Sequence, residues 1–79
     1  AIAFPLPDDG CRRRLFGVYG RGLDLSGLDL GRWVGQTAGT SPAFIEELLR
    51  KAALMAAERG EPGPALRLAD DDVQNALRE

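Results

Sequence analysis

The chain has 79 residues, of which 44% are hydrophobic and 28% charged, and its formal net charge is −2. These values suit one small globular domain and argue against disorder. One cysteine excludes an internal disulfide framework, and the absence of histidine excludes the usual Cys/His zinc site and any histidine-activated nucleophile. No apolar run approaches the ~20 residues of a membrane span, and the mild acidity gives no reason to expect nucleic-acid binding. We therefore expect a cytoplasmic domain that contacts neither membranes nor nucleic acids and holds no metal.

The first seven residues differ from the rest of the chain. Four apolar residues come first, and Pro5 and Pro7 follow them. Because proline cannot continue a strand ladder, this segment is predicted to be the end of a short strand.

The first predicted helix follows Asp8, a good N-cap, and runs to about Tyr19, before Gly20. Spacings of four and three residues predict one buried face, made of Cys11, Leu15 and Val18. We expect Cys11 to be packed in the core, since no histidine is present to activate it. Arg12–Arg14 fall mostly off this face, and a solvated surface with at most one structural partner is favoured over a phosphate site.

A loop over residues 23–28 is predicted to precede a short second helix. Leu30 begins its apolar pattern, and either Ser26 or Asp29 is available as the N-cap. This helix is expected to close near Thr37.

The third helix has the clearest local signal in the sequence. Ser41 is suited to the N-cap, and Pro42 to the first helical position, where its missing N–H costs nothing. The helix is expected to run to about Arg59, where Gly60 stops it. Its predicted buried stripe consists of Ile45, Leu48, Leu49, Ala52, Met55 and Ala56.

A brief extended segment at residues 66–68 is predicted to precede a fourth helix. Asp70–Asp72 begin that helix, where acidic side chains complement the helix dipole. A metal site is the alternative reading of these acids, but they lack the spacing, glycine and distal glutamate of an EF-hand. The sequence as a whole predicts an all-α protein, a four-helix bundle preceded by a short strand.

The order of these signals resembles the C-terminal helical lid of AAA+ ATPases over essentially the whole chain. Each motif is short, but together their order and spacing are specific. The stretches that carry the resemblance are Phe4-Pro5-Leu6-Pro7-Asp8 with Arg12 and Leu15-Phe16, Leu28-Asp29-Leu30 through Thr37-Ala38-Gly39, Thr40-Ser41-Pro42-Ala43-Phe44-Ile45 with Leu49-Arg50-Lys51-Ala52-Ala53, and Leu68 through Asp72-Val73 with Ala76-Leu77.

The resemblance implies two domains and four nucleotide-facing residues. Residues 1–7 would be the end of the last core strand and the hinge of a large ATPase domain, and residues 8–79 the lid subdomain. Adenine contacts would fall on two positions of the first helix and two at the start of the third: Leu15, Tyr19, Pro42 and Ala43.

Several positions depart from the family pattern. Tyr19 stands where histidine is frequent, Pro42 replaces a glycine, and Phe44 replaces an aspartate. No arginine stands at the start of the third helix to act as sensor 2, and Arg50 lies more than two turns further along.

The implied function is to close over the adenine of ATP or ADP and to pass nucleotide state to neighbouring subunits of a hexameric ring that remodels proteins. The expected partners are the large ATPase subdomain, the neighbouring subunits and a protein substrate. No Walker A or Walker B motif is present, so we expect no catalytic residues and no bound nucleotide in the chain alone. The alternative is a free-standing helical interaction module that uses Ile2, Phe4 and Leu6. If the chain is instead a lid without its large domain, the apolar surface that meets that domain is exposed, and self-association through Ile2 and Phe4 is expected.

Overall fold

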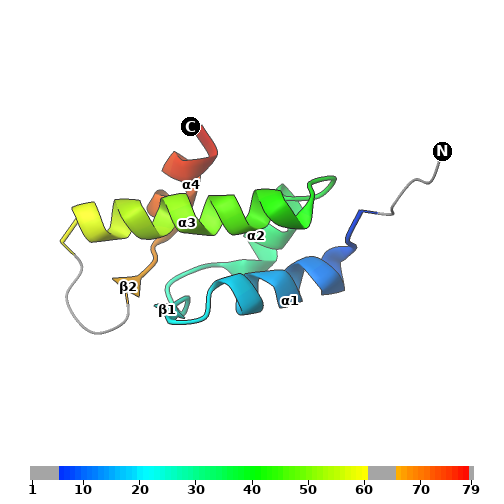
Figure 1. Cartoon of the computed structure of the whole chain (residues 1–79), viewed down its shortest axis with the longest axis horizontal. Coiled ribbons are helices and arrows are strands. Elements are labelled where there is room, and N and C mark those ends of the chain that lie inside the picture. The colour runs from blue at the N-terminus through cyan, green and yellow to red at the C-terminus, as the bar shows by residue number, and fades with distance from the viewer. Residues whose placement is uncertain (1–5, 61–65, 79) are drawn as a thin grey trace.

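The computed structural model describes residues 6–60 and 66–78 and is mostly helical (Figure 1). It therefore confirms the predicted all-α class and the four helices. The predicted N-terminal strand falls on residues 1–5, outside the described residues, and Leu6 and Pro7 have no regular secondary structure. The elements in chain order are α1 (Asp9–Tyr19), β1 (Leu23–Asp24), α2 (Leu30–Gln36), α3 (Pro42–Glu58), β2 (Leu66–Arg67) and α4 (Asp70–Arg78).

Three of the helices begin at the predicted caps. The side chain of Asp8 accepts the N–H of Cys11 at 2.8 Å, and Asp29, one of the two predicted candidates, accepts the N–H of Arg32 at 3.3 Å. Ser41 caps α3 with Pro42 in its first turn. Each cap satisfies a backbone donor that has no partner within the helix.

Glycine in the left-handed conformation follows the ends of α2 and α3. Gly39 has a φ of 83° and Gly60 a φ of 82°. An L side chain rarely adopts this backbone conformation, so glycine turns the chain here at the least cost.

A two-residue parallel sheet joins segments that are far apart in the sequence. Leu23 pairs with Leu66 and Asp24 with Arg67. The prediction of a loop over residues 23–28 is wrong for its first two residues, since β1 forms there. A strand this short carries no periodic signal, and the strand it pairs with lies 43 residues further along the chain.

One core holds the helices together. α3 lies across the molecule and packs against both α1 and α4 (Figure 1). The predicted α3 stripe is confirmed except for Met55, which is only partly buried. The buried hydrophobic residues are Phe16, Trp33, Val34, Ile45, Leu48, Leu49, Ala52, Ala56, Leu68, Val73 and Ala76.

The buried face of α1 differs from the prediction. Cys11 is exposed and Val18 is 51% exposed, whereas Arg12 and Phe16 are buried. Phe16 buries a larger apolar area than either Cys11 or Val18, so the helix turns its aromatic side toward α3. Arg12 lies one helical turn before Phe16 on the same face, so its side chain is also buried.

Arg12 is a structural residue, so the predicted solvated face of Arg12–Arg14 is wrong for Arg12, which is buried, and holds for the two arginines after it. Its Nε donates to the Val34 carbonyl at 2.9 Å, and its Nη1 to the Pro7 carbonyl at 2.7 Å. A further bond joins Arg12 to Asp9. The guanidinium thus ties the segment before α1 to the end of α2, while Arg13 and Arg14 stay exposed.

Candidate functional site

The two predicted contact residues on α1 are accessible from one side. Leu15 and Tyr19 lie one helical turn apart, and both are partly buried against the core. Residues four apart on a helix share a face. They therefore form one apolar surface that is anchored in the core and still partly exposed.

The two predicted residues on α3 are adjacent and exposed. Pro42 and Ala43 occupy its first turn, immediately after the Ser41 cap. α3 packs directly against α1, so both pairs lie on neighbouring helices that share one core. A small residue at an exposed helix start lets a flat ligand approach the backbone closely, and the helix dipole is positive there.

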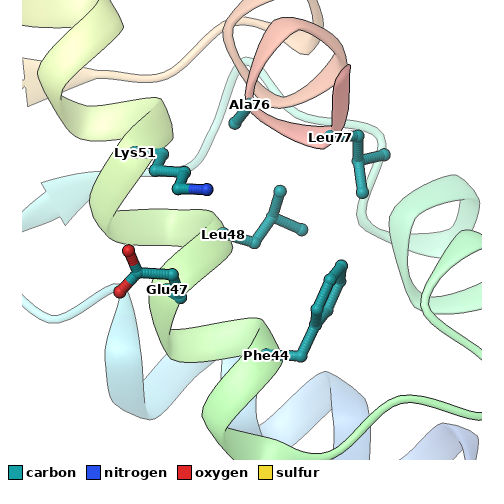
Figure 2. Close-up of a pocket in the computed structure, with 6 residues that line it drawn as sticks. All are labelled: Phe44, Glu47, Leu48, Lys51, Ala76 and Leu77. Atoms are coloured by element: carbon teal, nitrogen blue, oxygen red, sulfur yellow. The ribbon is translucent and has the colours of Figure 1, made fainter. Parts of the chain in front are cut away.

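A shallow hollow lies between α3 and α4, and the sequence did not predict it. Phe44, Leu48 and Lys51 line it from α3, and Ala76 and Leu77 from α4 (Figure 2). Phe44 is 42% exposed although it is a large aromatic residue. The sequence held one signal for this exposure: Phe44 lies one residue before the buried stripe of α3 begins, and therefore beside that stripe.

Two aspartates hold α4 against the rest of the bundle. Asp70 accepts the indole N–H of buried Trp33 at 2.7 Å and the backbone N–H of Asp29 at 3.1 Å. Asp72 accepts from Arg59 at 2.7 Å and from the backbone N–H of Ala69 at 2.9 Å. These bonds connect the start of α4 to α2 and to the end of α3.

These hydrogen bonds also lower the pKa values of the two carboxyl groups. The bond from Trp33, followed by that from the Asp29 N–H, lowers the pKa of Asp70. Burial of Asp72 raises its pKa, but the bonds from Arg59 and Ala69 outweigh burial and leave it lowered. Both side chains are therefore structural anions, and the predicted solvated helix start holds only for Asp71, which is exposed.

The other charged residues that the sequence singled out do not assemble into a site. Across residues 6–60 and 66–78, no cluster of three or more potential ligands is arranged to hold a metal ion. Arg50 is exposed and paired with Glu47, whose pKa the arginine lowers. Within the same described ranges, no helix is long and apolar enough to cross a membrane.

Comparison with known proteins places this helical chain beside an ATP-dependent enzyme. No family model matches the chain. Over 56 residues it is 39% identical to the ATP-dependent zinc metalloprotease FTSH 12, chloroplastic, of Arabidopsis thaliana. The match covers 70% of this chain and 6% of that relative, so the chain spans only a small part of its length. The similarity supports an AAA+ ATPase-related segment.

Proposed function

We propose that this chain is the helical lid subdomain of an AAA+ ATPase. The observation that carries the proposal is the 39% identity over 56 residues to part of an ATP-dependent metalloprotease. A four-helix bundle of this element order agrees with it. In this proposal residues 8–79 form the lid, and residues 1–7 lead into it from a large ATPase subdomain.

The nucleotide would lie against two neighbouring helices. Leu15 and Tyr19 would meet the flat faces or edges of adenine, because apolar and aromatic side chains pack well on a base. Pro42 and Ala43 would approach the base or ribose at the start of α3. The chain carries no P-loop, so the phosphates of ATP or ADP would be held by the large subdomain.

Lid movement would convert nucleotide state into contact with neighbouring subunits. α1 and α3 share one core, so a ligand that touches both would move the bundle as a rigid body. ATP and ADP shift such an equilibrium only through different affinities for its two positions. The proposed assembly is a cytoplasmic hexameric ring that remodels a protein substrate, and hydrolysis belongs to the whole protein.

The test uses ATPase kinetics of the protein that contains this segment behind a P-loop. Tyr19→Ala and Ala43→Asp are expected to raise the KM for ATP by about tenfold each, with little change in kcat. A loss of about 1.4 kcal/mol in nucleotide binding corresponds to that factor. For Ala43→Asp the cause is a carboxylate facing the ligand, and for Tyr19→Ala it is lost packing.

The matched control is Ala57→Asp, which makes the same substitution at an exposed position near the other end of α3. Its KM should stay within about twofold of the unchanged protein. Circular dichroism checks that each variant is folded. Unchanged KM values for both site variants would contradict the adenine contacts, and a protein without any ATPase activity would contradict the lid assignment.

A free-standing interaction module is the second candidate. The hollow between α3 and α4, where Phe44 is exposed, favours this second candidate, since large exposed aromatics mark contact surfaces. This candidate requires a natural protein with no P-loop before residue 1 and no nucleotide-dependent activity. The ATPase assay therefore separates the two candidates.

A further inference from the structure

The hollow between α3 and α4 is apolar and has room for one side chain. Leu48 and Ala76 line it and are buried, while Phe44 and Leu77 stand beside them with part of their surface exposed (Figure 2). The hollow has a volume of about 160 Å³. An apolar cavity of about 150 Å³ is large enough to bind benzene, so one large aliphatic or aromatic group fits here.

A positive charge lies at the edge of this hollow. Figure 2 shows the Lys51 ammonium on the side of the hollow and the Glu47 carboxylate turned to the other side of α3. Glu47 is paired with Arg50, and that bond is the chief cause of its lowered pKa, to which the charge of Lys51 contributes least. Among the residues that the structure describes, no carboxylate forms an ion pair with Lys51. The ligand that complements this hollow is therefore apolar and carries a negative charge beside its apolar group.

The size and walls of the hollow favour a protein ligand over a small molecule. Pockets for small molecules typically enclose about 300–1,000 Å³ and bury most of the ligand, whereas this hollow is smaller and leaves Phe44 exposed. Its walls are two helices, an arrangement that accepts an amphipathic helix from a partner. Protein interfaces often take most of their affinity from a few large side chains that fill such pockets.

The spacing along α3 determines where the negative charge must lie. Leu48 and Lys51 are three residues apart, which is about one turn of the helix. A partner helix that lies along α3 with an apolar side chain over Leu48 reaches the Lys51 ammonium with a carboxylate one turn away. We propose that the hollow binds an amphipathic helix of a partner protein through one large apolar side chain and an acidic side chain one turn from it. The inference goes beyond the lid function and needs no nucleotide.

The test is an NMR titration of the isotopically labelled 79-residue chain with a synthetic peptide. The peptide is alanine-based and about 16 residues long, which suffices for an isolated helix. It carries a central phenylalanine with a glutamate one turn before and one turn after it, so that either direction along α3 presents a carboxylate to Lys51. A matched peptide has lysine in place of both glutamates.

The acidic peptide is expected to bind with a dissociation constant of about 1 mM or below. The signals of Phe44, Leu48, Lys51 and Leu77 should shift most, because these residues line the hollow. The lysine peptide should bind at least about threefold more weakly, since an attractive pair becomes a repulsive one at a partly exposed site.

Reversing the charge at the edge of the hollow tests the electrostatic part of the proposal. Lys51→Glu should reverse the preference, so that the lysine peptide binds more tightly than the acidic one. Arg14→Glu is the matched control, because it makes the same charge reversal at an exposed position of α1. This variant should keep the preference for the acidic peptide.

Shortening the exposed aromatic residue tests the apolar part. Phe44→Ala should raise the dissociation constant of the acidic peptide at least about fivefold, because the phenylalanine of the peptide loses one wall of its pocket. Leu54→Ala removes another exposed apolar side chain of α3, which does not line the hollow. Its dissociation constant should stay within about twofold of the unchanged value. Circular dichroism confirms folding of every variant.

Several results would overturn the proposal. They are the absence of saturable shifts up to about 5 mM acidic peptide, shifts centred on another surface, and equal binding of the two peptides to the unchanged chain. Binding of phenylpropionate as tight as that of the peptide would also overturn it, because the hollow would then be a site for small molecules. None of these measurements depends on ATPase activity, so their failure would leave the lid proposal standing.

Discussion

At the scale of single residues, Arg12 is the most consequential side chain that the sequence misjudged. Its side chain is 5% exposed, whereas that of its ion-pair partner Asp9 is 83% exposed. Because the Asp9 carboxylate is solvated, this ion pair adds little stability on its own. The contacts that matter for stability are the hydrogen bonds that Arg12 donates to the backbone carbonyls of Val34 and Pro7.

Replacing Arg12 by leucine is expected to lower the free energy of unfolding by about 2 kcal/mol. The buried carbonyls would lose a charged donor, and such losses cost about 1–3 kcal/mol. Val34 keeps a longer bond from the Thr37 hydroxyl, at 3.2 Å, which limits the effect. Urea denaturation measures the change.

Arg13→Leu is the control for that prediction, because the neighbouring arginine is exposed. Its effect should stay within about 0.5 kcal/mol. Equal effects of the two substitutions would mean that the buried hydrogen bonds of Arg12 contribute nothing beyond its charge.

The sequence could not identify Arg12 as the buried arginine because its partners are backbone carbonyls. Neither Val34 nor Pro7 carries a side chain that signals an acceptor, and both become close only after folding. Apolar spacing on α1 also allowed two faces, one through Cys11 and Val18 and one through Phe16. Only the position of α3 decides between them.

At the scale of elements, α4 has an incomplete N-cap. The Ala69 carbonyl accepts the N–H groups of Asp72 and Val73, and the Asp72 carboxylate bonds back to the Ala69 N–H at 2.9 Å. This is half of a capping box. Alanine has no side-chain oxygen to supply the other half.

Ala69→Ser is expected to raise the free energy of unfolding by about 1 kcal/mol, because serine would accept the N–H of Asp72. Ala57→Ser, near the end of α3, makes the same substitution where no free helix N–H is available, and it should slightly destabilise the chain. Thermal unfolding measures both. A melting temperature that falls for Ala69→Ser would contradict this account of the cap.

Helix boundaries were the most predictable part of the fold. The chemistry of a cap is local, so the sequence alone placed Asp8 and Ser41 and left two candidates for the cap of α2, of which the structure uses Asp29. The pairing of β1 with β2 was unpredictable, since it depends on two dipeptides brought together by the helices between them. Short-range signals therefore located the helices, and long-range packing determined the rest.

At the scale of the whole molecule, the candidate site also has a part that was named from the sequence and a part that only the structure shows. The resemblance to AAA+ lids named Leu15, Tyr19, Pro42 and Ala43, and contact of these residues with nucleotide stays a prediction. The structure adds that they lie on two helices packed against each other. The hollow beside Phe44 could be found only from the structure, because its shape depends on how α4 crosses α3.

The stability of the whole bundle is expected to fall in acid, and Asp70 is the best position to test it. Its pKa is lowered in the folded state, chiefly by the bond from Trp33, so its contribution is present above the ordinary aspartate value of about 3.9 and is lost as pH falls below it. Asp70→Ala should lower stability at pH 7, because the indole N–H of Trp33 loses its acceptor, and should flatten the decline in stability below about pH 4.

Asp71→Ala removes an exposed neighbouring carboxylate and should retain the decline of the unchanged chain. Fluorescence of Trp33, the single tryptophan, follows unfolding at each pH, and identical pH profiles for the two variants would show that α4 is not held through Asp70.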